Sequence, residues 1–279
     1  MPSEPPVRSV KCCLARKDLP RLEVQLLLSD VLGQSREWLI AHDDHLMSHE
    51  KCQRFDELCQ QRLAGHPMAY LLGQREFMGL LLQVTPDVLI PRPETELLVQ
   101  AVLDRVSAVR QPRILDMGTG SGAIAVAVAH ARPDARVLAT DVSPRAIDVA
   151  RRNARAHGLD IEFAVGSWFD ALPADAPPFH VIASNPPYIH PEDAHLTQGD
   201  LRFEPQLALT EGVDGLSAYR VLARGCQPWL VTGGSLCVEH GYDQQAAVRD
   251  IFVGAGLQNV ETLLDLCAHP RVTAGSYNG

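Results

Sequence analysis

A glycine-rich turn directly after a short apolar run constrains the possible folds of this chain more than any other feature. The segment Asp116–Gly122 reads DMGTGSG, and it lies between the apolar pair Ile114–Leu115 and the helical pattern of Ala123–Ala131. A strand, a glycine turn and a helix in this order are typical of open α/β sheets, which bind ligands at the carboxyl ends of their strands. The sequence therefore predicts an α/β fold with a binding site at this turn.

The chain after Pro112 continues to alternate short apolar runs with helical patterns, which favours a mostly parallel, doubly wound sheet covered on both faces. Further strands are predicted at Val137–Thr140, Ile161–Val165, His180–Ser184, Ser235–Glu239 and Val260–Leu264, and helices at Glu94–Val106, Ser143–His157, Ala218–Leu230 and Gln244–Gly254. Ser143 is the expected N-cap of its helix, with Pro144 at the first helical position.

The N-terminal region has a different pattern, with apolar residues at helical spacing from Asp18 to Leu63. Gly33 and Gly65 are expected to end helices. A segment this short can bury little core, so we expect a small helical domain that leans on a second one. The predicted organisation is a helical domain at 1–70, a β-hairpin connector at 71–93 and an α/β domain at 94–279.

The residues of the glycine turn indicate which ligand it binds. Gly118, Gly120 and Gly122 let the backbone approach a ligand closely, and their GxGxG spacing differs from the GxGxxG of dinucleotide-binding folds. Asp116 places a negative charge at the end of the first strand, where it would attract a cationic amino acid group. Asp141 ends the next strand, where a carboxylate can accept hydrogen bonds from both ribose hydroxyls. Together they predict S-adenosyl-L-methionine rather than NAD, with Asp116, Gly118, Thr119, Gly120, Ser121, Gly122 and Asp141 as cofactor-binding residues.

A second motif, Asn185-Pro186-Pro187-Tyr188, follows the predicted strand His180–Ser184. The two prolines fix φ and remove two backbone donors, so carbonyl groups here can point at a ligand. The side-chain oxygen of Asn185 and the carbonyl of Pro186 could each accept one N–H of a planar amide or amino group, while Tyr188 offers a flat surface. We therefore predict that all four residues bind substrate and that Asn185, Pro186 and Tyr188 are catalytic, by positioning and without a strong base.

With these motifs the chain resembles the HemK/PrmC-type release factor glutamine methyltransferases, which modify the glutamine of a Gly-Gly-Gln loop. The resemblance also covers GQREFMG (Gly73–Gly79), IPRPETE (Ile90–Glu96), GSWFDAL (Gly166–Leu172), RFEPQLAL (Arg202–Leu209) and VEHG (Val238–Gly241). It implies a Rossmann-like class I methyltransferase domain preceded by a small helical domain that grips the release factor. It further implies cofactor contacts from Trp168 and Asn185, and a pocket mouth shaped by Arg92, Glu94 and Glu96.

Other functions remain open at this point. The same NPPY chemistry would serve an adenine amino group or a glutamine of a ribosomal protein. A formal net charge of −9 and the lack of a dense basic run disfavour nucleic acid. A cofactor-binding module without turnover is disfavoured by the intact Asn185 and Tyr188, and an oxidoreductase by the GxGxG spacing.

Cysteine and histidine usage favours a cytoplasmic protein without a metal. Seven scattered cysteines form no CxxC pair, which is typical of a reducing compartment. No apolar run approaches the roughly 20 residues of a membrane span. His42, His45 and His49 share one helix face among acidic neighbours, and we interpret them as a solvated surface rather than a metal site.

Overall fold

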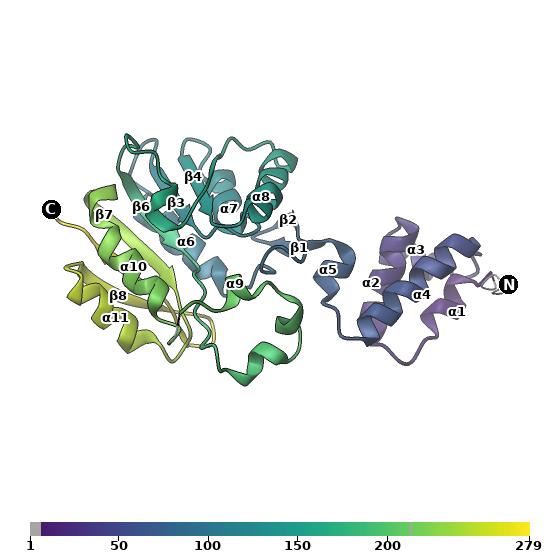
Figure 1. Ribbon diagram of the computed structural model, residues 1–279. Helices are drawn as coiled ribbons and strands as arrows, with labels where there is room; N and C mark the ends of the chain where they lie inside the picture. Colours follow the sequence, from purple (N-terminus) through teal and green to yellow (C-terminus); the bar gives the residue numbers. More distant parts are fainter. Residues whose placement is uncertain (1–6, 213) are drawn as a thin grey trace. The chain divides into compact units, whose positions relative to one another are not determined.

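The computed structural model describes residues 7–212 and 214–279, and the chain divides into two compact units between Gly73 and Gln74 (Figure 1). Each unit has a buried core of its own. The hairpin predicted as a separate connector at 71–93 is grouped with the second unit, so the three-part division at 1–70, 71–93 and 94–279 stays a prediction.

The first unit is helical, and three of its helices start at serines. It contains α1 (Val10–Leu14), α2 (Arg21–Leu32), α3 (Arg36–Ala41), α4 (His49–Leu63) and α5 (Met68–Leu72). Ser9, Ser35 and Ser48 cap α1, α3 and α4, because each hydroxyl accepts a hydrogen bond from a backbone N–H of the first turn. Helix α2 ends at Gly33 with a φ of 66°, as predicted.

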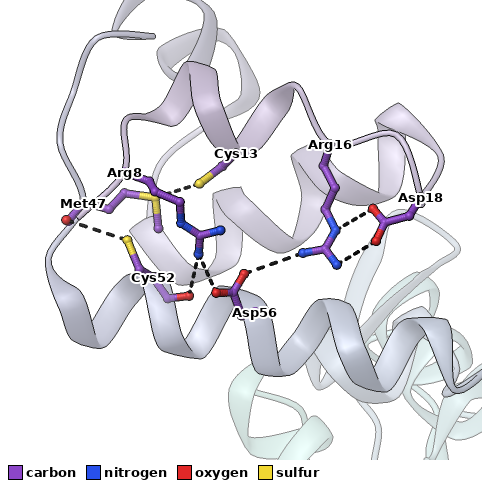
Figure 2. Close-up of polar contacts among 7 residues, drawn as sticks. All are labelled: Arg8, Cys13, Arg16, Asp18, Met47, Cys52 and Asp56. Carbon is purple, nitrogen blue, oxygen red and sulfur yellow. Dashed lines mark hydrogen bonds and ion pairs between the residues drawn. The ribbon is translucent and has the colours of Figure 1, made fainter. Parts of the chain in front are cut away.

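A polar network fastens the start of the first unit to α4 (Figure 2). Arg8 donates to the Asp56 carboxylate at 2.6 Å and to the Cys52 carbonyl at 3.3 Å. Arg16 lies 3.6 Å from the same carboxylate and also donates to Asp18. Asp56 therefore joins two basic side chains that are separated in sequence. The neighbouring Cys13 thiol is buried, and its burial raises its pKa to about 11.

The second unit is built on a seven-stranded sheet in the order β5-β4-β3-β6-β7-β9-β8, preceded by a separate antiparallel hairpin of β1 and β2. The strands are β1 (Gln74–Phe77), β2 (Leu80–Gln83), β3 (Arg113–Met117), β4 (Arg136–Asp141), β5 (Glu162–Val165), β6 (Phe179–Ser184), β7 (Leu230–Glu239), β8 (Gln258–Leu264) and β9 (Pro270–Ser276). The predicted mostly parallel sheet is confirmed, since β9 alone runs in the direction opposite to the other six strands.

Helices cover both faces of this sheet. Its α-helices are α6 (Thr95–Arg105), α7 (Ala123–Ala131), α8 (Pro144–Ala156), α9 (Gln206–Leu209), α10 (Ser217–Gly225) and α11 (Gln245–Gly254), with 3-10 turns η1 (Trp168–Ala171), η2 (Ala194–Thr197), η3 (Leu201–Phe203) and η4 (Gln227–Trp229). Helices α6, α7 and α8 pack on one face, and α10 and α11 on the other (Figure 1). Alternate strand residues serve the two cores, with Ile114 in one and Leu115 in the other.

One strand was not predicted, and one predicted helix is shorter in the structure. Strand β9 was not predicted, and it inserts between β7 and β8. The helix predicted at Ala218–Leu230 ends at Gly225, because Pro228 lies in a short 3-10 turn and Leu230 already begins β7.

Candidate active site

The order of the strands creates a binding crevice between β3 and β6. From β3 the chain adds β4 and then β5 toward one edge of the sheet. It then returns to β6 on the other side of β3, and β7 follows toward the opposite edge. Ligands of open α/β sheets bind beyond the carboxyl ends of the strands at such a reversal. A cavity of about 300 Å³ lies here, and its wall includes Gly118, Asp141, Trp168 and Asn185.

Two of the three turn glycines face the cavity, and the third serves packing. Gly118 and Gly120 line the cavity with φ values of 71° and 56°, and a Cβ added to either would stand in open space. Gly122 is not part of the cavity wall, and its added Cβ would lie 3.0 Å from the Cβ of Ala150 on α8. The turn therefore combines a ligand cradle with close packing of α7 against α8.

Asp141 fastens the tip of the glycine turn to the end of β4. Its Oδ2 accepts the N–H of Gly120 at 2.9 Å, and its Oδ1 accepts the N–H of Ser143 at 2.8 Å. Burial raises the pKa of the Asp141 carboxyl despite these donors. Asp141 lines the cavity, where the remaining lone pairs of its carboxylate can accept further donors from a ligand.

Asp116 lies beneath the turn and is completely buried. Its Oδ2 accepts hydrogen bonds from the Thr119 hydroxyl at 2.6 Å and from the N–H of Ala125 at 3.2 Å. Its Oδ1 has no hydrogen-bond partner among the described residues, and burial raises the pKa of this carboxyl to about 7. Asp116 is absent from the cavity wall described here, so its contact with a cationic ligand group stays a prediction, while its hold on the turn is a finding.

Trp168 forms one wall of the cavity in a strained backbone conformation. Its φ is 44°, which bulky residues rarely adopt. The preceding turn is tight, because a Cβ at Gly166 would lie 2.7 Å from the Cα of Ala171. Strain of this kind persists where the surrounding structure requires it, often at a binding site. Trp168 lines the cavity, and its contact with a cofactor stays a prediction.

The NPPY segment divides between the cavity and the core. Asn185 and Pro187 line the cavity, and Asn185 donates its Nδ2 hydrogen to the Thr95 hydroxyl at 3.1 Å. Pro186 is buried. Tyr188 packs against the core under the sheet, and its carbonyl accepts from Gln244 at 3.0 Å. The described contacts give Tyr188 an anchoring role, so its stacking on substrate stays a prediction.

Two segments complete the cavity wall, and of their residues only Arg92 was expected at the pocket. They are 87–92 from the chain after the hairpin and 205–211 around α9. Arg92 binds the buried carboxylate of Glu204 at 2.5 Å, and Glu204 also accepts the N–H of Ile90 at 3.3 Å. Both segments overlap the IPRPETE and RFEPQLAL motifs, which were the available signal in the sequence.

The acidic residues next to Arg92 have other positions. Glu94 precedes the first residue of α6, and Glu96 accepts the N–H of Met78 at 3.3 Å, which ties α6 to the hairpin turn. Neither is part of the cavity wall. Of the three residues expected at the pocket mouth, only Arg92 lines it.

The prediction that His42, His45 and His49 share one helix face is wrong, because α3 ends at Ala41 and His49 begins α4. His42 stacks on Trp38 with ring centroids 4.4 Å apart, and His45 meets the same ring edge-on at 5.1 Å. Within residues 7–212 and 214–279, no group of three or more His, Cys, Asp or Glu side chains is arranged to hold a metal ion. All seven cysteines are free thiols, and no helix in this part of the chain is both long and apolar enough to cross a membrane.

Comparison with solved structures places the second unit among methyltransferase folds. A methyltransferase from Pyrococcus furiosus matches with a TM-score of 0.53 at 16% identity, covering 72% of this chain and 90% of that one. The T. thermophilus 16S rRNA N2 G1207 methyltransferase matches with a TM-score of 0.54 at 19% identity, covering 74% of this chain and 50% of that one. At these identities the likeness concerns the fold alone, and it agrees with the predicted Rossmann-like class.

Sequence comparison is more specific. The PrmC N-terminal domain model matches residues 7–73, and the methyltransferase small domain model matches residues 93–201. The release factor glutamine methyltransferase of Bordetella pertussis is 50% identical over 95% of this chain and 98% of its own. The enzyme of the same description from Escherichia coli is 43% identical over 95% of each chain. The chain therefore belongs to the release factor glutamine methyltransferase family.

Proposed function

We propose that this protein transfers the methyl group of S-adenosyl-L-methionine to the side-chain amide nitrogen of the glutamine in the Gly-Gly-Gln motif of peptide chain release factors. The observation that carries this proposal is the position of Asn185, whose amide nitrogen is held by Thr95 at the wall of the cavity. Because the Nδ2 of Asn185 donates to Thr95, the Oδ1 of Asn185 is available as an acceptor for a substrate N–H.

The residues of the cavity fit the predicted cofactor. The open space above Gly118 and Gly120 lets a ligand lie against the backbone, and the Asp141 carboxylate can accept ribose hydroxyls. Trp168 would offer an aromatic neighbour for an adenine. Asp116, which is buried beneath the turn and has an unpartnered Oδ1 among the described residues, would supply a negative charge toward the methionine end. When bound, S-adenosyl-L-methionine supplies a methyl group on a positively charged sulfur, which is already electrophilic.

The chain's own contribution is to orient a weak nucleophile. An amide nitrogen shares its lone pair with the carbonyl, so it reacts only when held at a near-attack distance with the lone pair toward the methyl group. The Oδ1 of Asn185 and the carbonyl of Pro186 would each accept one N–H of the glutamine. Pro186 and Pro187 stiffen this segment because neither has a free φ. Removing water from the cavity strengthens both hydrogen bonds.

The release factor, rather than nucleic acid, is the proposed substrate class. Support comes from the relatives at 43–50% identity, whose shared description names release factor glutamine methylation. The net charge of −9 also provides little attraction for phosphates. We propose that the enzyme works in the cytoplasm, where a translation factor would be its substrate, and that the first unit grips that factor.

Mass spectrometry tests this proposal directly. A release factor and a nucleic-acid pool are each incubated with the enzyme and methyl-labelled S-adenosyl-L-methionine. We expect label on the glutamine of the Gly-Gly-Gln motif and none on the nucleic acid. Label on adenine, or on a glutamine of a ribosomal protein added in a parallel reaction in place of the release factor, would overturn the substrate assignment.

Two substitutions separate the proposed roles within the site. Asn185→Ala should abolish methyl transfer and leave cofactor affinity nearly intact, because it removes the acceptor for the substrate N–H. Asp141→Ala should weaken cofactor binding first, since it removes the ribose acceptor and also releases the N–H groups of Gly120 and Ser143. Calorimetry with S-adenosyl-L-homocysteine, beside the transfer assay, measures both effects. Equal losses of affinity in the two variants would contradict this division.

A further inference from the structure

A buried carboxylate, Glu239, lies beside the substrate-positioning asparagine and has no part in the chemistry described so far. It ends β7, which pairs in parallel with β6 so that Val238 is opposite Ser184. Glu239 therefore lies next to Asn185, the first residue after β6. Its residue exposure is 1%, and its Oε2 has no hydrogen-bond partner among the described residues.

Thr95 connects these two side chains. It is the first residue of α6 and is also buried, with 4% exposure. Its hydroxyl oxygen accepts the Nδ2 hydrogen of Asn185 at 3.1 Å. Burial raises the pKa of Glu239, and side-chain hydrogen bonding with Thr95 and Asn185 lowers it, so both groups lie near the carboxylate.

We propose that Glu239 is a positioning residue that sets the orientation of the Asn185 amide through the Thr95 hydroxyl, an inference that rests on the proposed function of Asn185. An ionised carboxylate can only accept hydrogen bonds, so it requires the Thr95 hydroxyl to donate toward it. The Thr95 oxygen then accepts from the NH₂ group of Asn185. The Oδ1 of Asn185 is thereby directed to the cavity, where it selects substrates that present an N–H.

The polarity of this chain of hydrogen bonds depends on the protonation state of Glu239. A protonated carboxyl can donate to Thr95, which could then donate to the Oδ1 of Asn185 and turn the NH₂ group toward the cavity. In that orientation Asn185 would present a donor to the substrate amide nitrogen, which also carries hydrogens. The orientation that favours transfer therefore belongs to the ionised form.

The groups around Glu239 place this change in an accessible pH range. The pKa of Glu239 is about 7, because burial and the nearby Glu94 raise it while Thr95, Arg271 and Asn185 lower it. Tyr188 and Tyr219 also face this carboxylate, and its charge helps to raise the pKa of both phenols, so neither ionises in this range.

Steady-state kinetics of matched variants tests the proposal. Thr95→Val removes the hydroxyl at nearly constant shape, and Glu239→Gln removes the charge. We expect kcat for release factor methylation to fall about 10- to 100-fold in each, with the affinity for S-adenosyl-L-homocysteine within about twofold of the wild type. Thr95→Ser keeps the hydroxyl and should restore most of the rate. Thr273→Val, which removes a buried hydroxyl bonded to His240 on the same sheet, is the control and should not change kcat.

The pH profile separates positioning from mere structural support. The kcat of the wild type should decline toward acid with a midpoint near 7, because burial raises the pKa of Glu239 to about 7, and Glu239→Gln should lack this decline. The result that overturns the proposal is a wild-type kcat and pH profile in both Thr95→Val and Glu239→Gln. If Glu239→Gln fails to fold, Thr95→Val and Thr95→Ser decide the matter alone.

A measurement without substrate keeps this inference separate from the proposed function. The side-chain NH₂ resonances of Asn185, assigned by their absence in Asn185→Ala, should shift with pH near 7 in the wild type and stay constant in Glu239→Gln. The wild type could show this titration and yet methylate no release factor. That outcome would contradict the proposed function but support the coupling of Glu239 to Asn185. If these resonances do not shift with pH in the wild type, the coupling of Glu239 to Asn185 is wrong.

Discussion

At the scale of single residues, the glycine turn satisfies two separate demands within five positions. Gly118 and Gly120 leave room for a ligand, whereas Gly122 leaves room for Ala150 of the neighbouring helix. All three have positive φ, so any side chain there also strains the backbone. The repeated glycine reveals the turn in the sequence but not which glycine serves which purpose.

Alanine substitutions should distinguish the two demands. Both Gly120→Ala and Gly122→Ala should cost about 1–2 kcal/mol of stability for the positive φ. Gly122→Ala should lose about 1–3 kcal/mol more, because its methyl group overpacks against α8. Gly120→Ala should instead weaken S-adenosyl-L-homocysteine binding by about tenfold or more, since its methyl group enters the cavity. Thermal unfolding and calorimetry measure the two quantities, and a larger affinity loss in Gly122→Ala would reverse the assignment.

Asp116 gives a pH-dependent prediction of its own. Its pKa is about 7 in the folded protein and 3.8 without the fold. The folded state therefore holds a proton that the unfolded state loses between those values, so this carboxyl's contribution to stability is full below about pH 4 and is lost as the pH rises to about 7. The slope is about 1.4 kcal/mol for each pH unit in that window.

Asp116→Asn should remove this dependence. The amide oxygen can still accept from Thr119 and Ala125, and no charge is buried at high pH. We expect the variant to be more stable than the wild type at pH 8 and to lose that advantage near pH 4, as measured by urea unfolding. Other buried carboxyls with raised pKa values, such as Glu239, remain in both proteins, so their contribution cancels in the difference. A difference that does not vary with pH would contradict the expected titration.

At the scale of elements, short local sequence signals were sufficient to predict some helices but not to predict strand β9 near the end of the chain. Ser143 and Pro144 marked the start of α8, and the Ser143 hydroxyl does cap it by accepting from the N–H of Ala146. Strand β9 has no comparable signal, because it begins at Pro270 and contains Gly275. Its position is decided by pairing with β7 and β8 and by the close packing of Gly275 against Phe252.

The cavity mouth depends on a contact between two distant elements. Glu204, with a completely buried side chain, holds Arg92 and the N–H of Ile90. Burial raises the pKa of Glu204 even though Arg92 opposes the shift. The segment around α9 is thus fixed over the chain that precedes α6, more than 100 residues earlier in the sequence.

Glu204→Gln should loosen this contact. A neutral amide keeps one acceptor but loses the charge that binds Arg92, which should cost about 1–3 kcal/mol of stability. Cleavage of the segment 190–212 by a nonspecific protease should become faster, and S-adenosyl-L-homocysteine should dissociate more quickly. Arg202→Gln, a change in the same segment on an exposed residue outside the cavity wall, serves as the comparison. Equal proteolysis rates in Glu204→Gln and the wild type would contradict the role of this ion pair.

At the scale of the whole molecule, the two units have separate cores and unequal shares of the site. Every residue described as lining the cavity belongs to the second unit. The first unit matches the PrmC N-terminal domain model and buries its own cluster around Leu27, Leu28 and Phe55. Cofactor binding and substrate gripping should therefore be separable by truncation.

A fragment of residues 74–279 tests this separation. It should bind S-adenosyl-L-homocysteine with an affinity close to that of the full chain, because it keeps the whole cavity wall. Its KM for an intact release factor should rise, while its rate on a short Gly-Gly-Gln peptide should change little. A KM for the intact factor equal to that of the full chain would remove the first unit from substrate recognition.

The sequence by itself determined the fold class, the glycine turn, Asp141 and the NPPY segment, because each depends on residue types at short, fixed spacing. The tertiary structure decided which of these residues reach the cavity, since that depends on the order of strands and the direction of side chains. It buried Asp116, packed Tyr188 against the core and brought Glu204 and Glu239 to the site from far along the chain. Such long-range pairing leaves no local trace, because it results from strands and loops packing together only after the sheet has formed.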